Sequence, residues 1–229
     1  MNIKMGKYVF QGVSIQNQRS QNMDRLLIKE KKVIGGNIYL AAVCDGVGSL
    51  EDGAFAASIA IHMLDGWIEK IEDTDRLGLR LRDAVIEINK QIVMLSRNRN
   101  LKTASTLSAI LIAEKKYYIV HLGDSRIYSY CEKRLFQLTN DHVSNGRLTN
   151  CLGLKEQIDI FYNEGLCGNA LFFLCSDGLY KKMDEKYFQE ELDHISRRRL
   201  RKVAKRLMQY VIQQGETDNI SLVILLSKD

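Results

Sequence analysis

The sequence predicts an α+β domain in which helices cover packed antiparallel sheets. Three observations support this: strand-like apolar runs near both ends, two consecutive helical stripes that separate the first strands from the next group, and a further helical stripe before the last strand. The 229 residues, 45% of them apolar, suffice for one sizeable core, and no stretch rich in Gly, Ser or Pro marks a linker. We therefore expect a single domain over residues 1–229.

The first part of the chain is predicted to contain two extended segments and then two helices. Residues 12–28 and 32–44 form the extended segments, with a turn signal at Gly35-Gly36-Asn37. Apolar residues then recur at spacings of three and four, first at Ala57, Ile61, Leu64, Ile68 and Ile71 and later at Leu81, Val85, Ile88, Ile92 and Leu95. Each set places one apolar stripe on a helix. We expect the second helix to be capped by Asp73, Thr74 or Asp75.

The second half of the chain returns to strands. They are predicted over residues 106–113, 117–122, 126–130 and 135–138, and the polar turns between them indicate meander-like antiparallel pairing. A further strand covers residues 171–175. Ser196 is predicted to open a helix that ends before Gly215 and carries one apolar face, formed by Leu200, Val203, Leu207 and Val211. Residues 220–226 form the last strand.

Composition excludes several classes of protein. Five cysteines, an odd number without a Cys-x-x-Cys pair, suit a reducing compartment and argue against a zinc site or a disulfide framework. The formal net charge is +5, but the basic run at residues 197–202 is interpreted as a solvated helix face rather than a nucleic-acid site. No apolar run approaches the roughly 18–20 residues of a membrane span, and the amino terminus does not resemble a signal peptide. We expect a soluble, cytoplasmic protein.

Five aspartates carry the chemistry that the sequence suggests: Asp24, Asp45, Asp124, Asp177 and Asp218. Each lies in a short context of glycine, asparagine or serine, and three adjoin strand-like runs. Carboxylates at strand ends can converge on one point, where they repel one another unless cations neutralise them. This pattern predicts a metal site.

The residue types indicate which metal and which reaction. Oxygen ligands without accompanying His or Cys ligands favour Mg²⁺ or Mn²⁺ over zinc or copper. Gly46 and Gly178 directly follow Asp45 and Asp177, and a residue without Cβ lets backbone and water approach a cation closely. Two such ions that share a water lower its pKa and prepare it to attack a phosphoryl group. Arg19, five residues before Asp24, is suited to bind phosphate, because its guanidinium matches two phosphate oxygens.

Each fragment also has a plainer interpretation. Asp-Gly pairs are common in turns, and Gly123-Asp124-Ser125-Arg126 can be a simple bend with an Asp124–Arg126 contact. The four histidines show no ligand spacing, and structural roles are the better interpretation for His62, His121, His142 and His194.

Taken in order, the fragments resemble the metal-dependent protein serine/threonine phosphatases of type 2C, the PPM family. The resemblance extends from about residue 8 to 226 and rests on these segments: Arg19, Asn22-Met23-Asp24, Val43-Cys44-Asp45-Gly46-Val47-Gly48, Ala104-Ser105-Thr106-Leu107, Leu122-Gly123-Asp124-Ser125-Arg126, Leu138-Thr139-Asn140-Asp141-His142, Leu152-Gly153, Leu174-Cys175-Ser176-Asp177-Gly178-Leu179 and Asp218-Asn219-Ile220.

The resemblance implies a four-layer α-β-β-α sandwich of two antiparallel sheets, with the metal centre in a cleft at one end. By position, Asp45 bridges two ions, Gly46 ligates through its carbonyl and Asp24 binds a coordinated water. Asp177 and Asp218 complete the coordination of the other ion, and Asp124 with Asp177 supports a third ion that binds more weakly. Arg19 binds phosphate. The implied substrates are phosphoserine and phosphothreonine in proteins. The resemblance therefore implies that the protein removes phosphate groups that a serine/threonine kinase has added. We expect a monomer that does not bind nucleic acid.

The chain departs from the family pattern at four places. Met23 replaces an acidic or amide residue, Val47 stands where animal members carry a histidine proposed as general acid, and Ser49 replaces a glycine. Only residues 143–151 separate Asp141-His142 from Leu152-Gly153, where bacterial members usually insert a longer flap. A short flap should leave the cleft open and alter substrate choice.

Two alternatives to a phosphoprotein phosphatase stay open at this point. One is a catalytically weak regulatory module that keeps the fold and binds a phosphoprotein, which Met23, Val47 and the short flap favour. The other is a different two-metal phosphoesterase such as a nuclease, because clustered carboxylates alone do not name the phosphate ester.

Overall fold

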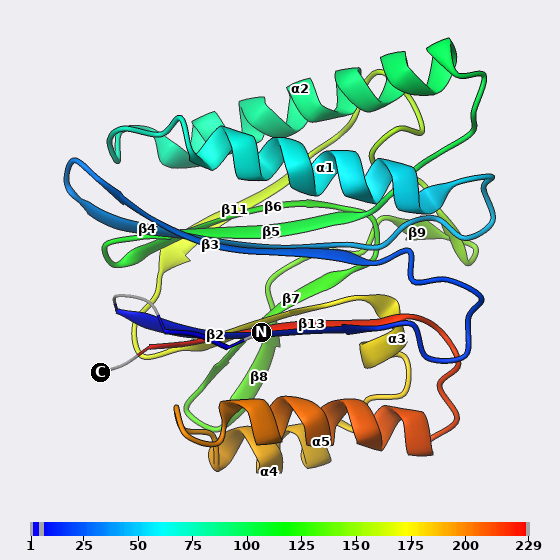
Figure 1. The fold of residues 1–229 in the computed structure, drawn as a ribbon. Helices are drawn as coiled ribbons and strands as arrows, with labels where there is room; N and C mark the ends of the chain where they lie inside the picture. The colour runs from blue at the N-terminus through cyan, green and yellow to red at the C-terminus, as the bar shows by residue number, and fades with distance from the viewer. Residues whose placement is uncertain (1, 5–6, 228–229) are drawn as a thin grey trace.

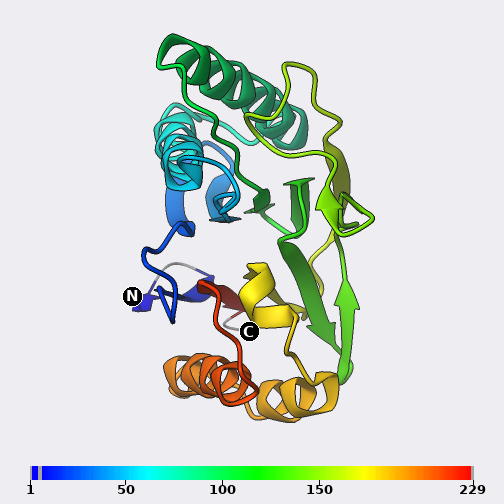
Figure 2. The same ribbon diagram turned by 90° about the vertical axis from the view of Figure 1, so that its right-hand side faces the viewer.

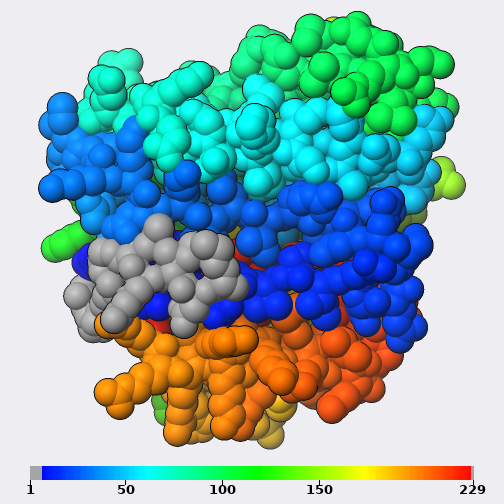
Figure 3. Space-filling model, in the orientation of Figure 1, coloured from blue at the N-terminus to red at the C-terminus, as the bar shows by residue number. Residues whose placement is uncertain are grey.

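The computed structural model describes residues 2–4 and 7–227 and shows two antiparallel sheets packed face to face, with helices on both outer faces (Figures 1 and 2). The predicted α+β fold and the four-layer α-β-β-α sandwich are therefore confirmed. Figure 3 shows the same layering on the surface, with α1 and α2 above the strands and α5 below them. No helix within the described residues is long and apolar enough to cross a membrane.

The two sheets differ in size. The six-stranded sheet has the order β1 (Asn2–Lys4), β2 (Tyr8–Ile15), β13 (Ile220–Ser227), β12 (Leu171–Cys175), β7 (Arg126–Cys131) and β8 (Arg134–Gln137). The five-stranded sheet has the order β11 (Phe161–Leu166), β6 (Lys116–Leu122), β5 (Leu107–Ala113), β4 (Gly36–Cys44) and β3 (Arg25–Val33). A separate small hairpin consists of β9 (Val143–Ser144) and β10 (Arg147–Leu148).

Two pairs of helices complete the layers. The five-stranded sheet is covered by α1 (Gly53–Ile68) and α2 (Leu77–Asn98), and the six-stranded sheet by α4 (Glu185–Asp193) and α5 (Leu200–Gln213). The single-turn helix α3 (Asp177–Tyr180) directly follows β12.

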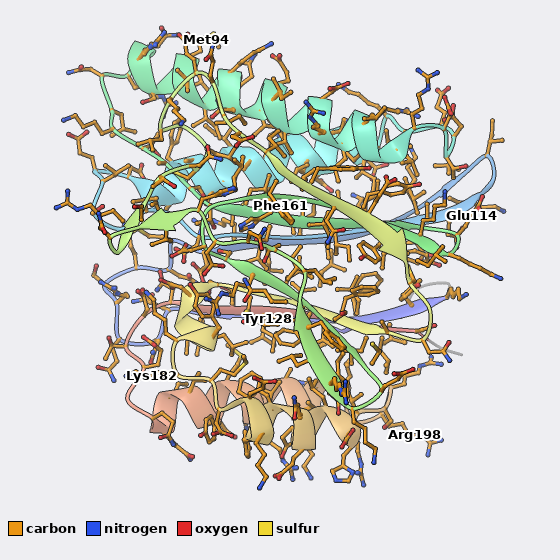
Figure 4. All side chains as sticks on the ribbon, turned by 180° about the vertical axis from the view of Figure 1, so that it is seen from behind. Met94, Glu114, Tyr128, Phe161, Lys182 and Arg198 are labelled. Carbon is orange, nitrogen blue, oxygen red and sulfur yellow. The ribbon has the colours of Figure 1, made fainter. Side chains whose placement is uncertain are left out.

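Three apolar clusters fill the spaces between the layers, as the side chains in Figure 4 illustrate. The central strands contribute to two clusters at once. In β4, Leu40 and Ala42 face α1 and α2, whereas Tyr39 and Ala41 between them face the other sheet. Successive strand residues point to opposite faces, so a strand buried on both sides must be apolar throughout. This explains the continuous apolar runs on which the strand predictions rested.

The structure corrects the predicted connections. Residues 12–28 are not one extended segment: β2 ends at Ile15, the chain crosses between the sheets, and β3 begins at Arg25. The meander predicted over residues 106–138 is likewise divided, because β5 pairs with β6 in one sheet and β7 with β8 in the other. Local patterns predicted β4 to β8, β12 and β13 but not the sheet that each one joins, and they missed β1, β9, β10 and β11.

Helix starts were also predicted incorrectly. Neither Asp73, Thr74 nor Asp75 caps α2: its N-cap is Arg76, with a φ of 46° and no side-chain cap. The last long helix begins at Leu200 rather than at Ser196, whose carbonyl instead accepts a hydrogen bond from the Arg199 N–H in a turn. The turn at Gly35-Gly36 and the end of α5 before Gly215 are confirmed, with φ values of 97°, 138° and 83° at these glycines.

One buried polar side chain, Asn89 of α2, fixes the loop that leads to β11. Its amide Nδ2 donates to the carbonyls of Lys155 at 2.9 Å and Glu156 at 3.0 Å, and its Oδ1 accepts from the Gly153 N–H at 2.9 Å. Asn89 is fully buried, so these three bonds replace bonds to water.

Replacement of Asn89 should therefore be costly. We expect Asn89→Ala to lower the free energy of unfolding by roughly 3 kcal/mol, because three backbone groups lose their partner. Urea denaturation measures the change. The same substitution at the exposed Asn98 of α2 should change the free energy by less than about 0.5 kcal/mol. Equal effects at the two positions would contradict this account.

Candidate metal centre

Strand register brings the five aspartates to one end of the sandwich. In the five-stranded sheet the first residue of β3 pairs with the last residue of β4. Asp24 directly precedes that pair and Asp45 directly follows it. In the six-stranded sheet the first residue of β7 pairs with the last of β12, and Asp124 and Asp177 lie two residues beyond that pair. Asp218 lies two residues before β13, the neighbour of β12.

The loops at this end enclose a cleft of about 310 Å³. Its walls contain six of the seven predicted site residues: Arg19, Asp45, Gly46, Asp124, Asp177 and Asp218. The seventh, Asp24, is only 2% exposed and lies behind the lining. As far as the described residues show, the cleft is lined by neither histidine nor cysteine, so its anionic donors are carboxylate oxygens.

Asp24 is the most deeply buried of the five carboxylates. Its Oδ2 accepts a hydrogen bond from Ser176 Oγ at 2.8 Å, but its buried Oδ1 has no hydrogen-bond partner among the described residues. Burial, together with the negative charge of Asp177, raises the pKa of Asp24 to about 6. An unpartnered carboxylate oxygen in the interior is unfavourable, and a cation or a water bound to a cation would satisfy it.

Asp45 is fixed through its backbone, which leaves its side chain to the cleft. Its N–H donates to Thr106 Oγ1 at 2.9 Å, and its carbonyl accepts from the Thr106 N–H at 2.8 Å and from Ser105 Oγ at 3.0 Å. Burial raises the pKa of Asp45 well above its usual value, and the charges of Asp24, Asp177 and Asp124 raise it further. Three carboxylates therefore act on Asp45, and no cationic side chain among the described residues forms an ion pair with it.

Gly46 has no room for a side chain. A Cβ at this position would lie 2.5 Å from the carbonyl carbon of Gly53, the first residue of α1. The Val47 N–H donates to the Ala104 carbonyl at 2.9 Å and holds the loop in place. The glycine thus allows the start of α1 to pack directly against the loop that carries Asp45.

Asp124 lies in the tight crossing between β6 and β7. Gly123 before it has a φ of 103°, and a Cβ there would lie 2.6 Å from the Thr106 side chain. His142 supports the crossing, since its Nδ1 accepts from the Gly123 N–H at 3.1 Å and its own N–H donates to the Gly123 carbonyl at 2.7 Å. Burial raises the pKa of Asp124 to about 6, with a further contribution from Asp177.

The simple bend with an Asp124–Arg126 contact is not what the structure shows. Arg126 instead forms a two-pronged ion pair with Asp141, with its Nη2 2.7 Å from Asp141 Oδ2, and its guanidinium lies 3.7 Å from the ring centre of Tyr180. Asp124 therefore faces the cleft while Arg126 ties the loop before β9 to α3.

Among the described residues, Asp177 and Asp218 differ from the other three because each has a cationic partner. The Arg19 guanidinium holds Asp218 with two bonds, Nε to Oδ1 at 2.8 Å and Nη2 to Oδ2 at 2.6 Å. Burial alone would raise the pKa of Asp218, but the hydrogen bonds from Arg19 and from the Asn219 N–H lower it overall. Lys181 donates to Asp177 Oδ2.

Two supporting residues were not predicted from the sequence. Asn219 binds both ends of the loop that carries Arg19, because its Nδ2 donates to the carbonyls of Gln16 at 2.8 Å and Gln21 at 3.0 Å. Lys181 was missed although its position four residues after Asp177, on a short helix, is a recognisable ion-pair spacing. The departures Met23, Val47 and Ser49 do line the cleft.

The residues present fit a hard divalent cation such as Mg²⁺ or Mn²⁺, which prefers oxygen ligands. The fit rests on the carboxylate oxygens of the cleft and the unpartnered Oδ1 of Asp24. Within residues 2–4 and 7–227, no three His, Cys, Asp or Glu side chains stand close enough to hold an ion as they are, and Asp177 and Asp218 are ion-paired instead. An ion ligated by Asp177 or Asp218 would therefore have to replace Lys181 or Arg19.

A sandwich of this topology with an acidic cleft at one end is the architecture of a known class of phosphatases. A solved bacterial serine phosphatase has the same fold, with a TM-score of 0.88 at 20% identity over 96% of this chain and 97% of that one. The catalytic domain of the serine threonine protein phosphatase PstP in complex with two manganese ions superposes with a TM-score of 0.81 at 25% identity, covering 97% and 99% of the two chains.

The sequence comparisons are more specific. The serine/threonine phosphatase stp of Listeria monocytogenes is 29% identical to this chain over an aligned length of 238 positions, and the alignment covers 92% of each chain. The model of the protein phosphatase 2C family matches residues 11–215. The chain belongs to the protein phosphatase 2C family, as its motifs predicted, and is a protein phosphatase.

The raised pKa of Asp24 predicts how stability depends on pH without divalent ions. The ordinary pKa of this group is 3.8, whereas the folded protein holds it at about 6. The resulting contribution to stability is fully present below about pH 4 and is lost as the pH rises through about 6, because the folded protein keeps a proton that the unfolded chain releases. In EDTA, between pH 4 and pH 7, the free energy of unfolding of the wild type should fall by roughly 2 kcal/mol relative to Asp24→Asn.

Urea titrations at the two pH values measure this difference. The control is Asp83→Asn on the exposed side of α2, which should follow the wild type. An Asp24→Asn variant with the wild-type pH dependence would show that this carboxyl does not hold the extra proton.

Proposed function

We propose that the protein hydrolyses phosphoserine and phosphothreonine in proteins at a centre of two Mg²⁺ or Mn²⁺ ions. The observation that carries this proposal is the convergence of five aspartates and one arginine on a single cleft with no histidine or cysteine in its described lining. The complex of PstP with two manganese ions, 25% identical to this chain, supports it.

The proposed assignment of ligands is the one that the resemblance to the type 2C phosphatases implies, and it is consistent with the residues that line the cleft. The negative charges of three other carboxylates act on Asp45. Asp45 would bridge the two ions, and Gly46 would contribute its carbonyl as a ligand. Asp24 would hold a coordinated water through its unpartnered Oδ1. Asp177 and Asp218 would complete the coordination of the other ion. Asp124 and Asp177 would together bind a third ion more weakly. The bound ions would activate a water for in-line attack and offset the charge of the phosphoryl group.

The protein's own residues bind and orient the substrate. Arg19 is 55% exposed in its side chain and stands at the cleft wall. Its planar guanidinium forms two parallel bonds to the Asp218 carboxylate, and the same geometry suits two oxygens of a phosphate. Val47 carries no proton to give, so the proton for the leaving serine or threonine oxygen would come from water.

The cellular setting follows from the proposed reaction. Phosphorylated proteins made by a serine/threonine kinase would be the substrates, and we propose that the protein acts in cytoplasmic signalling as a monomer. The basic residues 197–202 lie at the start of α5, on the outer layer and away from the residues that line the cleft. A nucleic-acid substrate therefore lacks a basic, aromatic path into the site.

Metal dependence is the first test of the proposal. Purified protein should hydrolyse a phosphothreonine peptide with Mn²⁺ or Mg²⁺ and stop in EDTA, and Asp45→Asn should lower kcat by at least about a hundredfold, because the bridging carboxylate is lost. The control Asp83→Asn should keep wild-type turnover. Hydrolysis that persists in EDTA would contradict the mechanism. Folded wild type that shows no turnover with either ion would favour the regulatory module, and cleavage of DNA or RNA would favour a nuclease.

The short hairpin at the cleft rim should influence the choice of substrate. Bacterial members of the family usually have a longer flap at this place, whereas this chain forms only the hairpin of β9 and β10. Asn145 and Gly146 join the two strands, with φ values of 50° and 72°. Leu148 of β10 lines the cleft, whereas Val143 of β9 is 41% exposed and does not.

Leu148→Ala should therefore lower kcat/KM for a phosphopeptide by roughly threefold to tenfold, because apolar contact with the residues beside the phosphate is lost. Hydrolysis of a small aryl phosphate should change by less than about twofold. Val143→Ala serves as the matched control on the same hairpin. Equal losses on both substrates would indicate damage to the catalytic centre rather than to the peptide site.

A further inference from the structure

Two ion pairs divide the five carboxylates of the cleft into two groups. Arg19 binds Asp218 and Lys181 binds Asp177, and these two acids form one group. The other three are Asp24, Asp45 and Asp124. Within the part of the chain that the structure describes, none of these three forms an ion pair. Two of the proposed ion ligands therefore already carry a cation supplied by the protein.

The Lys181 ammonium is held by the shape of α3. Its backbone N–H donates to the Asp177 carbonyl at 3.0 Å, which closes the single helical turn. The side chain folds back over this turn, so that Nζ donates to Asp177 Oδ2. The Asp177 side chain is 14% exposed and that of Lys181 is 51% exposed. The ammonium thus covers a nearly buried carboxylate from the solvent side.

The charge on Lys181 also acts on the other acids of the cleft. Partial burial lowers the pKa of Lys181, but the hydrogen bond to Asp177 and the negative charges of Asp177, Asp124 and Asp218 raise the pKa overall. The ammonium therefore stays protonated at neutral pH. A divalent ion ligated by Asp177 would lie within a few ångströms of it and repel it.

We propose that Lys181 is an intramolecular counter-ion that competes with a divalent ion for the carboxylate of Asp177 and thereby weakens ion binding at that position. The inference rests on the metal centre proposed above. Its physical basis is that the flexible four-carbon stem of lysine lets the ammonium leave, while the ion pair with Asp177 must be broken each time an ion enters.

Mn²⁺ binding tests the proposal without reference to turnover. The metal-free wild type and three variants, Lys181→Met, Lys181→Arg and Lys182→Met, are titrated with Mn²⁺ at fixed ionic strength while electron paramagnetic resonance measures free Mn²⁺. The neighbouring Lys182, labelled in Figure 4, is exposed and provides the same change of net charge. Lys181→Met should bind Mn²⁺ about threefold more tightly or better at the affected site, given the strength of a partly exposed ion pair. Lys182→Met should bind like the wild type, and Lys181→Arg, which keeps a cation beside Asp177, should bind no more tightly than the wild type.

Thermal unfolding supplies a second, independent measurement. In EDTA, Lys181→Met should unfold at a lower temperature than the wild type, because Asp177 has lost its counter-ion beside other acids. At saturating Mn²⁺ the two proteins should unfold at the same temperature, since the ion then neutralises Asp177. The rise in Tm on adding Mn²⁺ is therefore larger for the variant. Lys181→Gln replaces the methionine variant if that one does not fold.

Three results would overturn the proposal. The first is wild-type Mn²⁺ affinity and a wild-type rise in Tm for the Lys181→Met protein. The second is an equal gain in affinity for the Lys182→Met protein, which would show an effect of net charge alone. The third is a wild type that binds no Mn²⁺, which would also overturn the proposed metal centre, whereas the first two leave that centre intact.

Discussion

The mutual repulsion of five carboxylates in one cleft is the constraint on which the rest of the site depends. Asp24 and Asp45 adjoin the same end of a strand pair, and Asp124 and Asp177 adjoin the same end of another. Burial opposes ionisation of such a group, and each neighbour raises the cost further. This cost of ionisation raises the pKa values of Asp24, Asp45 and Asp124. A fold that holds these acids together must be rigid enough to prevent them from moving apart.

Rigidity comes from the surrounding hydrogen bonds and from close backbone packing. Thr106 holds the backbone of Asp45, and Ser176 holds a carboxylate oxygen of Asp24. Thr106 lies directly before β5, and Ser176 is the N-cap of α3. Gly46 and Gly178 allow other backbone segments to approach where a Cβ would lie 2.5 Å and 2.1 Å from carbonyl groups. The three apolar clusters between the layers anchor the strands whose ends carry these loops.

Much of this arrangement was predictable from the sequence, and the failures have physical reasons. The strands β4, β12 and β13 are buried on both faces, so each is a continuous apolar run that marks its own ends and the aspartate beside it. The sheet that a strand joins depends on distant partners, which is why the crossings before β3 and β7 were missed. The N-cap of α2 is Arg76, which has a positive φ and no side-chain cap, so the sequence carries no capping signal there. The helix α4 was not predicted, because it buries only Phe188 and Leu192 and two residues do not form a recognisable apolar stripe.

The same distinction applies within the site. Aspartates in glycine contexts are visible along the chain, whereas the partners of Asp218 and Asp24 lie 199 and 152 residues away and become apparent only in three dimensions. Lys181 is different, because it is only four residues from Asp177 and lies on the same short helix. A metal-site pattern does not predict a lysine at this position, because its charge opposes the binding of a cation to that ligand. An ion ligated by Asp177 or Asp218 would have to replace a charge that the chain already provides, whereas an ion held by Asp24, Asp45 and Asp124 would meet no such partner among the described residues.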